Sequence, residues 1–188
     1  MEGIFDKINI DMPSISNTAR RFDAKAILAT LPDLSTLPEF NTWQQLSVTH
    51  SEVSNSWFDS VGSLYNYKLG KFDRATHDFT ILNQHFIGTY MEAAISEVKK
   101  QAIIDGVQIG RIRYMYLQPK TCYTLHTDPE EFRYHIPLVT NNKCFFVNGD
   151  VVERMPHVGW LYRFQTSVQH TAVNASNDVR IHLVFDTY

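Results

Sequence analysis

The 188-residue sequence has few cysteines, no excess of basic residues and no long apolar run. Cys122 and Cys144 are its only cysteines, and we expect reduced packing thiols, because their spacing lacks a zinc-like pair. The formal net charge of -3 offers no electrostatic footprint for nucleic acid. No apolar run approaches a membrane span, and residues 1–6 lack the basic and apolar segments of a signal peptide. The composition therefore favours a cytoplasmic protein that acts on small substrates, and it leaves the oligomeric state open.

The length and the 44% hydrophobic content predict one catalytic domain spanning residues 1–188. Residues 1–110 read as a mixed N-terminal half. We expect a strand over residues 5–10, then a helix that Asn17 or Thr18 caps and that runs toward Pro32. Apolar residues at three-four spacing between Phe79 and Val98 predict a long amphipathic helix that ends near Gly106.

Residues 111–188 read as nearly all strand, with turn signals between short alternating runs. The expected strands are 111–117, 121–128, 132–139, 143–148, 151–155, 159–165, 169–174 and 180–187. Eight short strands are the expected count for a double-stranded beta-helix, the cupin-type jelly roll. The sequence therefore predicts an α+β, mostly β, protein whose jelly-roll core is backed by helices from the N-terminal half.

The triplet His126-Thr127-Asp128 is the first candidate metal-binding motif. On a strand, alternate side chains share a face, so His126 and Asp128 can occupy two adjacent corners of a metal. His170, in a later strand-like run, can supply a third ligand. Two imidazoles and one carboxylate with open positions match the facial triad of non-heme Fe(II) oxygenases.

Arg180 opens the final predicted strand, in which Ile181, Leu183 and Phe185 supply an apolar face. Arg180 therefore lies on the opposite face, where a charged residue needs a partner. A bound dicarboxylate is one such partner, and a surface carboxylate is the plainer alternative.

Several ordered motifs between residues 111 and 188 resemble the aspartyl/asparaginyl beta-hydroxylase-like family of 2-oxoglutarate and Fe(II)-dependent dioxygenases, which includes free-proline cis-hydroxylases. The motifs are His126-Thr127-Asp128, Arg133-Tyr134-His135-Ile136-Pro137-Leu138, Gly159-Trp160, His170-Thr171-Ala172-Val173-Asn174 and Arg180-Ile181-His182-Leu183-Val184. The presence of Asp128 makes the likeness closer to the small bacterial-type members than to the eukaryotic aspartyl hydroxylases, which lack this carboxylate.

The resemblance implies roles for six residues. His126, Asp128 and His170 match the iron positions, and Arg180 matches the arginine that binds the distal carboxylate of 2-oxoglutarate. Arg133 and His135 match residues that line the co-substrate site. The implied reaction consumes 2-oxoglutarate and O2, releases succinate and CO2, and hydroxylates an amino acid, a peptidyl side chain or another small substrate.

Three alternatives compete with this interpretation. A nucleobase demethylase of the related type carries a second arginine six residues after the first, whereas Asp186 stands at that position here. A non-catalytic cupin-like protein would use the same residues to hold a structural metal or a sensed ligand. A metal-free, lectin-like jelly roll would give His170 and Arg180 no shared purpose.

Overall fold

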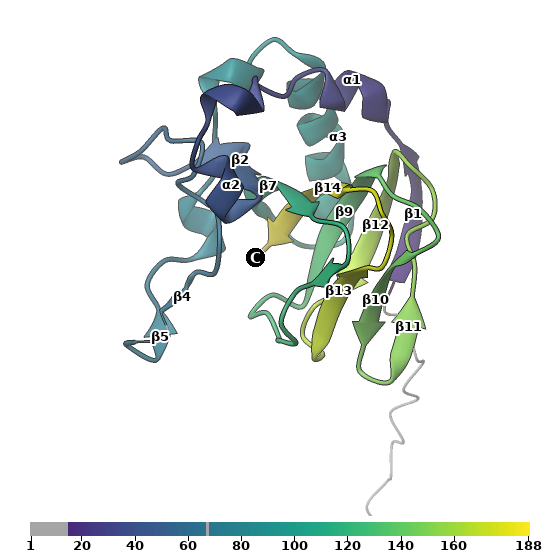
Figure 1. Ribbon diagram of the computed structural model, residues 1–188. Helices are drawn as coiled ribbons and strands as arrows, with labels where there is room; N and C mark the ends of the chain where they lie inside the picture. The colour runs from purple at the N-terminus through teal and green to yellow at the C-terminus, as the bar shows by residue number, and fades with distance from the viewer. Residues whose placement is uncertain (1–14, 67) are drawn as a thin grey trace, which may run out of the picture.

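The structure is a computed structural model that describes residues 15–66 and 68–188, and two antiparallel sheets form its centre (Figure 1). The six-stranded sheet has the order β1 (Ile15–Arg21), β12 (Trp160–Gln165), β9 (Phe132–Val139), β14 (Arg180–Thr187), β7 (Ile109–Leu117) and β2 (Gln45–Ser47). The four-stranded sheet has the order β11 (Val151–Glu153), β10 (Cys144–Asn148), β13 (His170–Asn174) and β8 (Thr121–Cys122). This pair of sheets is the predicted jelly roll.

Short elements from residues 24–104 surround the sheets. The helices are α1 (Ala24–Leu28), α2 (Phe40–Trp43) and α3 (Tyr90–Ile104), with 3-10 turns η1 (Leu34–Thr36), η2 (Thr76–Asp78) and η3 (Gln84–Phe86). Two small ladders join β3 (Thr49–His50) to β6 (Ile81–Leu82) and β4 (Tyr65–Asn66) to β5 (Lys71–Phe72). Figure 1 shows the β4–β5 hairpin projecting away from the two sheets. Among the described helices, none is long and apolar enough to cross a membrane.

The strands predicted for the second half are confirmed, with one exception. The predicted strand 121–128 is regular only at β8, and it continues as a loop with an isolated bridge between His126 and His170. The other boundaries agree with the prediction within two residues, because period-two patterns and turn signals mark both ends of each strand.

A helix toward Pro32 exists as α1, but the predicted cap at Asn17 or Thr18 is wrong. Both residues lie in β1, where the chain pairs with β12, and α1 begins later. The carboxylate of Asp23 caps α1 by accepting hydrogen bonds from the N–H groups of Lys25 and Ala26. Tertiary pairing with β12 therefore overrides a local capping signal. The predicted strand 5–10 lies outside the described residues.

The long helix exists, but it begins eleven residues later than its apolar pattern predicts. Thr89 caps α3 by accepting from the N–H of Met91, and Gly88 before it has a positive φ of 75°. Phe79 and Phe86 precede the helix yet are fully buried. Their three-four spacing therefore does not indicate a helix at these positions. Both side chains are buried in the turn-rich segment before α3.

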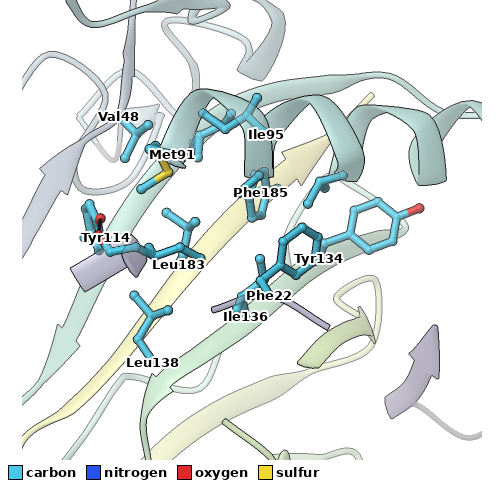
Figure 2. Packing of buried hydrophobic residues seen from close by; sticks show 14 of the residues in the cluster. Phe22, Val48, Met91, Ile95, Tyr114, Tyr134, Ile136, Leu138, Leu183 and Phe185 are labelled. Carbon is cyan, nitrogen blue, oxygen red and sulfur yellow. Dashed lines mark hydrogen bonds between the residues drawn. The ribbon is translucent and has the colours of Figure 1, made fainter. Parts of the chain in front are cut away.

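One main hydrophobic core lies between α3 and the six-stranded sheet. Figure 2 shows Met91 and Ile95 of α3 on the side of the helix that faces Leu183 and Phe185 of β14. Tyr114 of β7 is fully buried in the same cluster, and its hydroxyl donates to the carbonyl of Ile27. This packing uses one face of β14 and leaves the opposite face for the site.

The core predicts the effect of shortening Leu183, which is completely buried in β14. Leu183→Ala should lower the free energy of unfolding by about 2 to 5 kcal/mol, because it removes buried methyl groups and leaves a cavity. Urea unfolding followed by circular dichroism measures this change. The matched control Leu69→Ala, at an exposed leucine, should shift it by less than about 0.5 kcal/mol. Equal effects of the two substitutions would contradict the assigned core.

Candidate active site

His126 and His170 are brought together by the bridge between the loop after β8 and the first residue of β13. The N–H of His126 donates to the carbonyl of His170 at 3.1 Å, and the N–H of His170 donates back at 2.8 Å. The N–H of Asp128 donates to the carbonyl of Thr166 at 3.0 Å. Backbone hydrogen bonds therefore fix the triplet, although it does not lie on a continuous strand as predicted.

In both histidines, one ring nitrogen is hydrogen-bonded to a backbone carbonyl. Nδ1 of His126 lies 2.7 Å from the carbonyl oxygen of Thr124, and Nδ1 of His170 lies 2.8 Å from that of Val168. A carbonyl only accepts, so each Nδ1 carries the proton and each Nε2 presents a lone pair. This is the tautomer that coordination of a metal through Nε2 requires.

The two Nε2 atoms face the carboxylate of Asp128. Nε2 of His126 lies 3.8 Å from Oδ1, and Nε2 of His170 lies 3.4 Å from Oδ2. One ligand atom from each of the three residues lies within 4.8 Å of the other two. Electron pairs that converge in this way from two imidazoles and a carboxylate fit a divalent metal cation. The structure thus brings together all three residues predicted as metal ligands.

Arg133 from β9 lies directly behind this cluster. Its Nη1 is 2.6 Å from Oδ2 of Asp128, and its Nη2 donates to Oε2 of Glu130 at 3.2 Å. Burial opposes ionisation of Asp128, but the charge of Arg133 and the contact with His170 together outweigh it and lower the pKa of this carboxyl. Asp128 is therefore ionised at neutral pH, as a metal ligand must be. Arg133, predicted to line the co-substrate site, lies beside the metal cluster, and its partners are carboxylates of the protein.

Arg180 is buried at the start of β14 and forms no ion pair with a carboxylate of residues 15–66 or 68–188. Its described partners are the ring of His182 and the face of Phe146, whose centroid lies 4.7 Å from the guanidinium carbon. Burial lowers the pKa of Arg180 to about 10, so the side chain stays cationic at neutral pH. A buried cation without a counter-charge is costly and is well suited to an anionic ligand.

His135, predicted to line the co-substrate site, is also buried and lies beside His182. The two Nδ1 atoms are 3.4 Å apart. Burial, together with the nearby charge of Arg180, holds the pKa of each histidine well below its usual range. Both imidazoles are therefore neutral at neutral pH.

Sequence reasoning did not identify Asp186 as part of the site, although three arginines surround it. Arg111 Nε lies 2.5 Å, Arg113 Nη2 3.2 Å and Arg133 Nε 2.7 Å from its carboxylate oxygens. The pairing of β14 with β9 sets Asp186 opposite Arg133, and β7 supplies the other two arginines from its other side. Arg111 and Arg113, two residues apart in an apolar strand, are the signal that could have revealed this cluster.

Two neighbouring cavities with shared lining residues lie beside these side chains. A small inner cavity of about 40 Å³ is lined by His135, His170 and Arg180, among others. An outer cleft of about 860 Å³ is lined by residues of the N-terminal half, such as Gln45 and Phe72, and by the triplet. Met115, Tyr123, His126 and Arg133 line both spaces. The candidate metal site therefore lies between a charged inner cavity and a wide outer cleft.

A family model described as aspartyl/asparaginyl beta-hydroxylase matches residues 36–188. The chain belongs to this family. It is an oxidoreductase of the hydroxylase type, and the match extends well beyond the region that carries the sequence motifs. Among curated proteins, none matches the chain at a significant level.

Three solved structures are similar to this family member at low sequence identity, and the two with TM-scores above 0.5 share its fold. AviO1 from Streptomyces viridochromogenes Tue57 has a TM-score of 0.54 and 14% identity over 92% of this chain and 88% of that one. EvdMO1 has a TM-score of 0.52 and 15% identity, and the match covers 92% of this chain and 46% of that one. An oxidoreductase of the 2OG-Fe(II) oxygenase family from Burkholderia pseudomallei has a TM-score of 0.49 and 17% identity. That match covers 61% of this chain and 64% of that protein.

The arginine cluster predicts that Asp186→Asn is strongly destabilising. The substitution leaves three buried guanidiniums without their shared counter-charge, which should cost about 3 to 5 kcal/mol of unfolding free energy at neutral pH. Urea unfolding measures the loss. Asp59→Asn is a matched control, because the partner of Asp59, Arg74, is partly exposed and the pair should contribute less.

The same cluster predicts a pH dependence. Burial alone would raise the pKa of Asp186, but the three arginines lower it below its unfolded value. The carboxylate therefore contributes its full stability above the unfolded pKa of about 3.9, and this contribution declines as the pH falls below that value. Asp186→Asn should have a shallower loss of stability in acid. A variant with the parental acid slope would contradict the assignment.

Proposed function

We propose that this protein is a 2-oxoglutarate- and Fe(II)-dependent dioxygenase that hydroxylates an amino acid, a peptidyl side chain or a similar small substrate. The observation that carries the proposal is a three-residue metal cluster beside the buried, unpaired cation of Arg180, which shares a cavity with His126 and His170. A non-catalytic cupin-like binding protein has no need for this cation beside an open metal site.

His126, Asp128 and His170 would hold the iron, with both histidines coordinating through Nε2. The bound iron with 2-oxoglutarate would activate O2, and the reaction would release succinate and CO2. Three protein ligands leave positions for the co-substrate and O2. Asp128 fills the position that a halide would otherwise need, which favours hydroxylation over halogenation.

Arg180 would bind the distal carboxylate of 2-oxoglutarate in the inner cavity. The volume of this cavity suits one end of a small dianion, with the rest of the molecule extending toward the triplet. A planar guanidinium can bind a carboxylate with two parallel hydrogen bonds, and these fix orientation as well as affinity. Phe146 and Phe164 line the same cavity, and their apolar surfaces keep water away from the contact.

The outer cleft would receive the substrate that is hydroxylated. It is larger than a free amino acid requires and falls within the range of clefts that bind drug-sized molecules. Its lining combines apolar side chains with arginines of the Asp186 cluster. Among the three substrate classes, these dimensions favour a peptidyl side chain or another extended molecule. An amino-acid and peptide library is incubated with the protein, Fe(II), 2-oxoglutarate and air. Mass spectrometry should then show a gain of one oxygen in a peptide or another extended compound of the library.

His170→Ala should abolish metal-dependent succinate formation, because it removes one of three metal ligands. Co(II) affinity, measured anaerobically by titration calorimetry, should fall by at least about 10-fold, while the circular dichroism spectrum stays the same as that of the parent protein. The control His77→Ala changes an exposed histidine away from the described metal cluster and should leave both measurements unchanged. Normal turnover by His170→Ala would refute the metal assignment.

Arg180→Leu should weaken 2-oxoglutarate binding by about 30-fold to several hundred-fold, equivalent to about 2 to 4 kcal/mol. The protein without ligand should be no less stable than the parent, because the substitution removes a buried charge that has no counter-ion. Anaerobic titration of the charge-transfer band of the Fe(II) complex measures the affinity, and Arg154→Leu, at an exposed arginine, is the control. Parental affinity in Arg180→Leu would favour the non-catalytic alternative.

A further inference from the structure

His182 in β14 lies between Arg180 and His135, and all three side chains are buried. Nε of Arg180 donates to Nε2 of His182 at 3.1 Å, and Nη2 of Arg180 lies 2.9 Å from Nδ1. Nδ1 of His182 lies 3.4 Å from Nδ1 of His135. Arg180 thus has an imidazole where most buried arginines have a carboxylate.

These contacts determine where the proton of His182 lies. A guanidinium only donates, so the ring must be neutral and must offer it a lone pair. If Nε2 accepts from Nε of Arg180, then Nδ1 carries the proton and donates to His135, so two hydrogen bonds use different ring atoms and only the contact between Nη2 of Arg180 and Nδ1 is left as donor facing donor. In the opposite tautomer, the lone pair of Nδ1 would have to serve both neighbours while the Nε2 proton faced the Nε proton of Arg180. The contacts therefore favour the Nδ1–H tautomer.

The proton position of His135 follows from that of His182. Nδ1 of His135 accepts from His182, so Nε2 of His135 carries its proton. In the described part of the chain, Nε2–H of His135 has no hydrogen-bond partner, and the residue lines the inner cavity together with Arg180. It is therefore a free donor next to the cationic end of the site.

The surroundings keep this arrangement neutral and dry. Phe146 packs against the rings of His135 and His182 and against the guanidinium of Arg180. Burial and the charge of Arg180 both hold the pKa of His182 well below its usual range, in agreement with the donor and acceptor assignment. The side chain of His182 therefore acts as a fixed acceptor, and it does not neutralise the charge of Arg180.

We propose that His182 is a positioning residue, which orients Arg180 toward an anionic ligand and sets His135 as an Nε2–H donor to the same ligand. The inference rests on the proposed function in taking that ligand to be 2-oxoglutarate. A neutral acceptor holds the guanidinium in place and leaves its full charge for the co-substrate, whereas a carboxylate at residue 182 would compete with the co-substrate.

The first experiment compares His182→Leu with His182→Gln in the full-length protein. Leucine removes the acceptor, and we expect 2-oxoglutarate affinity to fall about 10-fold, as for the loss of one hydrogen bond to a charged group. Glutamine keeps an acceptor oxygen and should restore affinity to within about 3-fold of the parent. Co(II) affinity should be parental in both, since His182 contacts no metal ligand. His85→Leu is the control at a histidine that contacts the carbonyl of Thr30.

The second experiment observes the imidazole protons in the parent protein, and the variants serve only to assign the signals. Nitrogen-15 NMR of histidine-labelled, metal-free protein should show His182 as neutral Nδ1–H and His135 as neutral Nε2–H between pH 6 and 8. Signals missing in His182→Gln and in His135→Gln give the assignments. A charged ring, or His182 as Nε2–H, would overturn the inference.

The two experiments separate this inference from the function on which it rests. If the parent binds 2-oxoglutarate and His182→Leu binds it equally well, the positioning role is wrong and the proposed function stands. If the parent does not bind 2-oxoglutarate but shows both tautomers, the proposed co-substrate is wrong and the hydrogen-bonded arrangement of the two histidines is supported.

Discussion

Asp186 is a buried carboxylate on which three guanidiniums converge. The position of Asp128 in the metal cluster depends on these ion pairs. Arg111 and Arg113 reach it from β7, and Arg133 reaches it from β9. Burial together with the charge of Arg113 lowers the pKa of Arg111 to about 9, which shows how closely the cations crowd. Because Asp186 holds Arg133 from one side, Arg133 can hold Asp128 from the other. The carboxylate of the metal cluster is thus fixed through two ion pairs by the strand that also carries Arg180.

β14 divides the molecule along its own two faces. Ile181, Leu183 and Phe185 pack into the hydrophobic core, while the intervening Arg180, His182 and Asp186 build the charged and polar side of the site. The two ends of the strand differ in how their charges are paired. Asp186 supplies more than one arginine with a counter-charge, whereas Arg180 has only neutral partners. The charge left unbalanced is therefore confined to the inner cavity, where a dicarboxylate would offset it.

The sequence was sufficient to predict the jelly roll, because alternation and turn signals are local. Its ordered motifs were sufficient to group His126, Asp128, His170 and Arg180, although the triplet lies in a loop and not on the expected strand. The sequence was insufficient for the N-terminal half, where contacts between distant residues determine the local structure. The residues expected to start a helix instead lie in β1 and pair with β12. Phe79 and Phe86, expected in the long helix, lie in the turn-rich segment before it and are buried there. The roles of Asp186 and His182 escaped prediction for the same reason. Each role depends on which residue of β7 or β9 lies beside it, and one strand pattern does not contain that register.

The outer cleft draws part of its lining from a different region of the chain than the candidate metal cluster. The metal cluster and the inner cavity are built almost entirely from residues after Gly110, where the family motifs lie. The outer cleft adds Gln45, Leu64 and Phe72 from a region that carries no recognisable motif. Arg111 and Arg113 line this cleft and also bind Asp186, so a substrate that meets them contacts the charge cluster that positions Asp128. A change in the outer wall can therefore alter substrate preference without touching the metal ligands, whereas a change in the arginines would affect both.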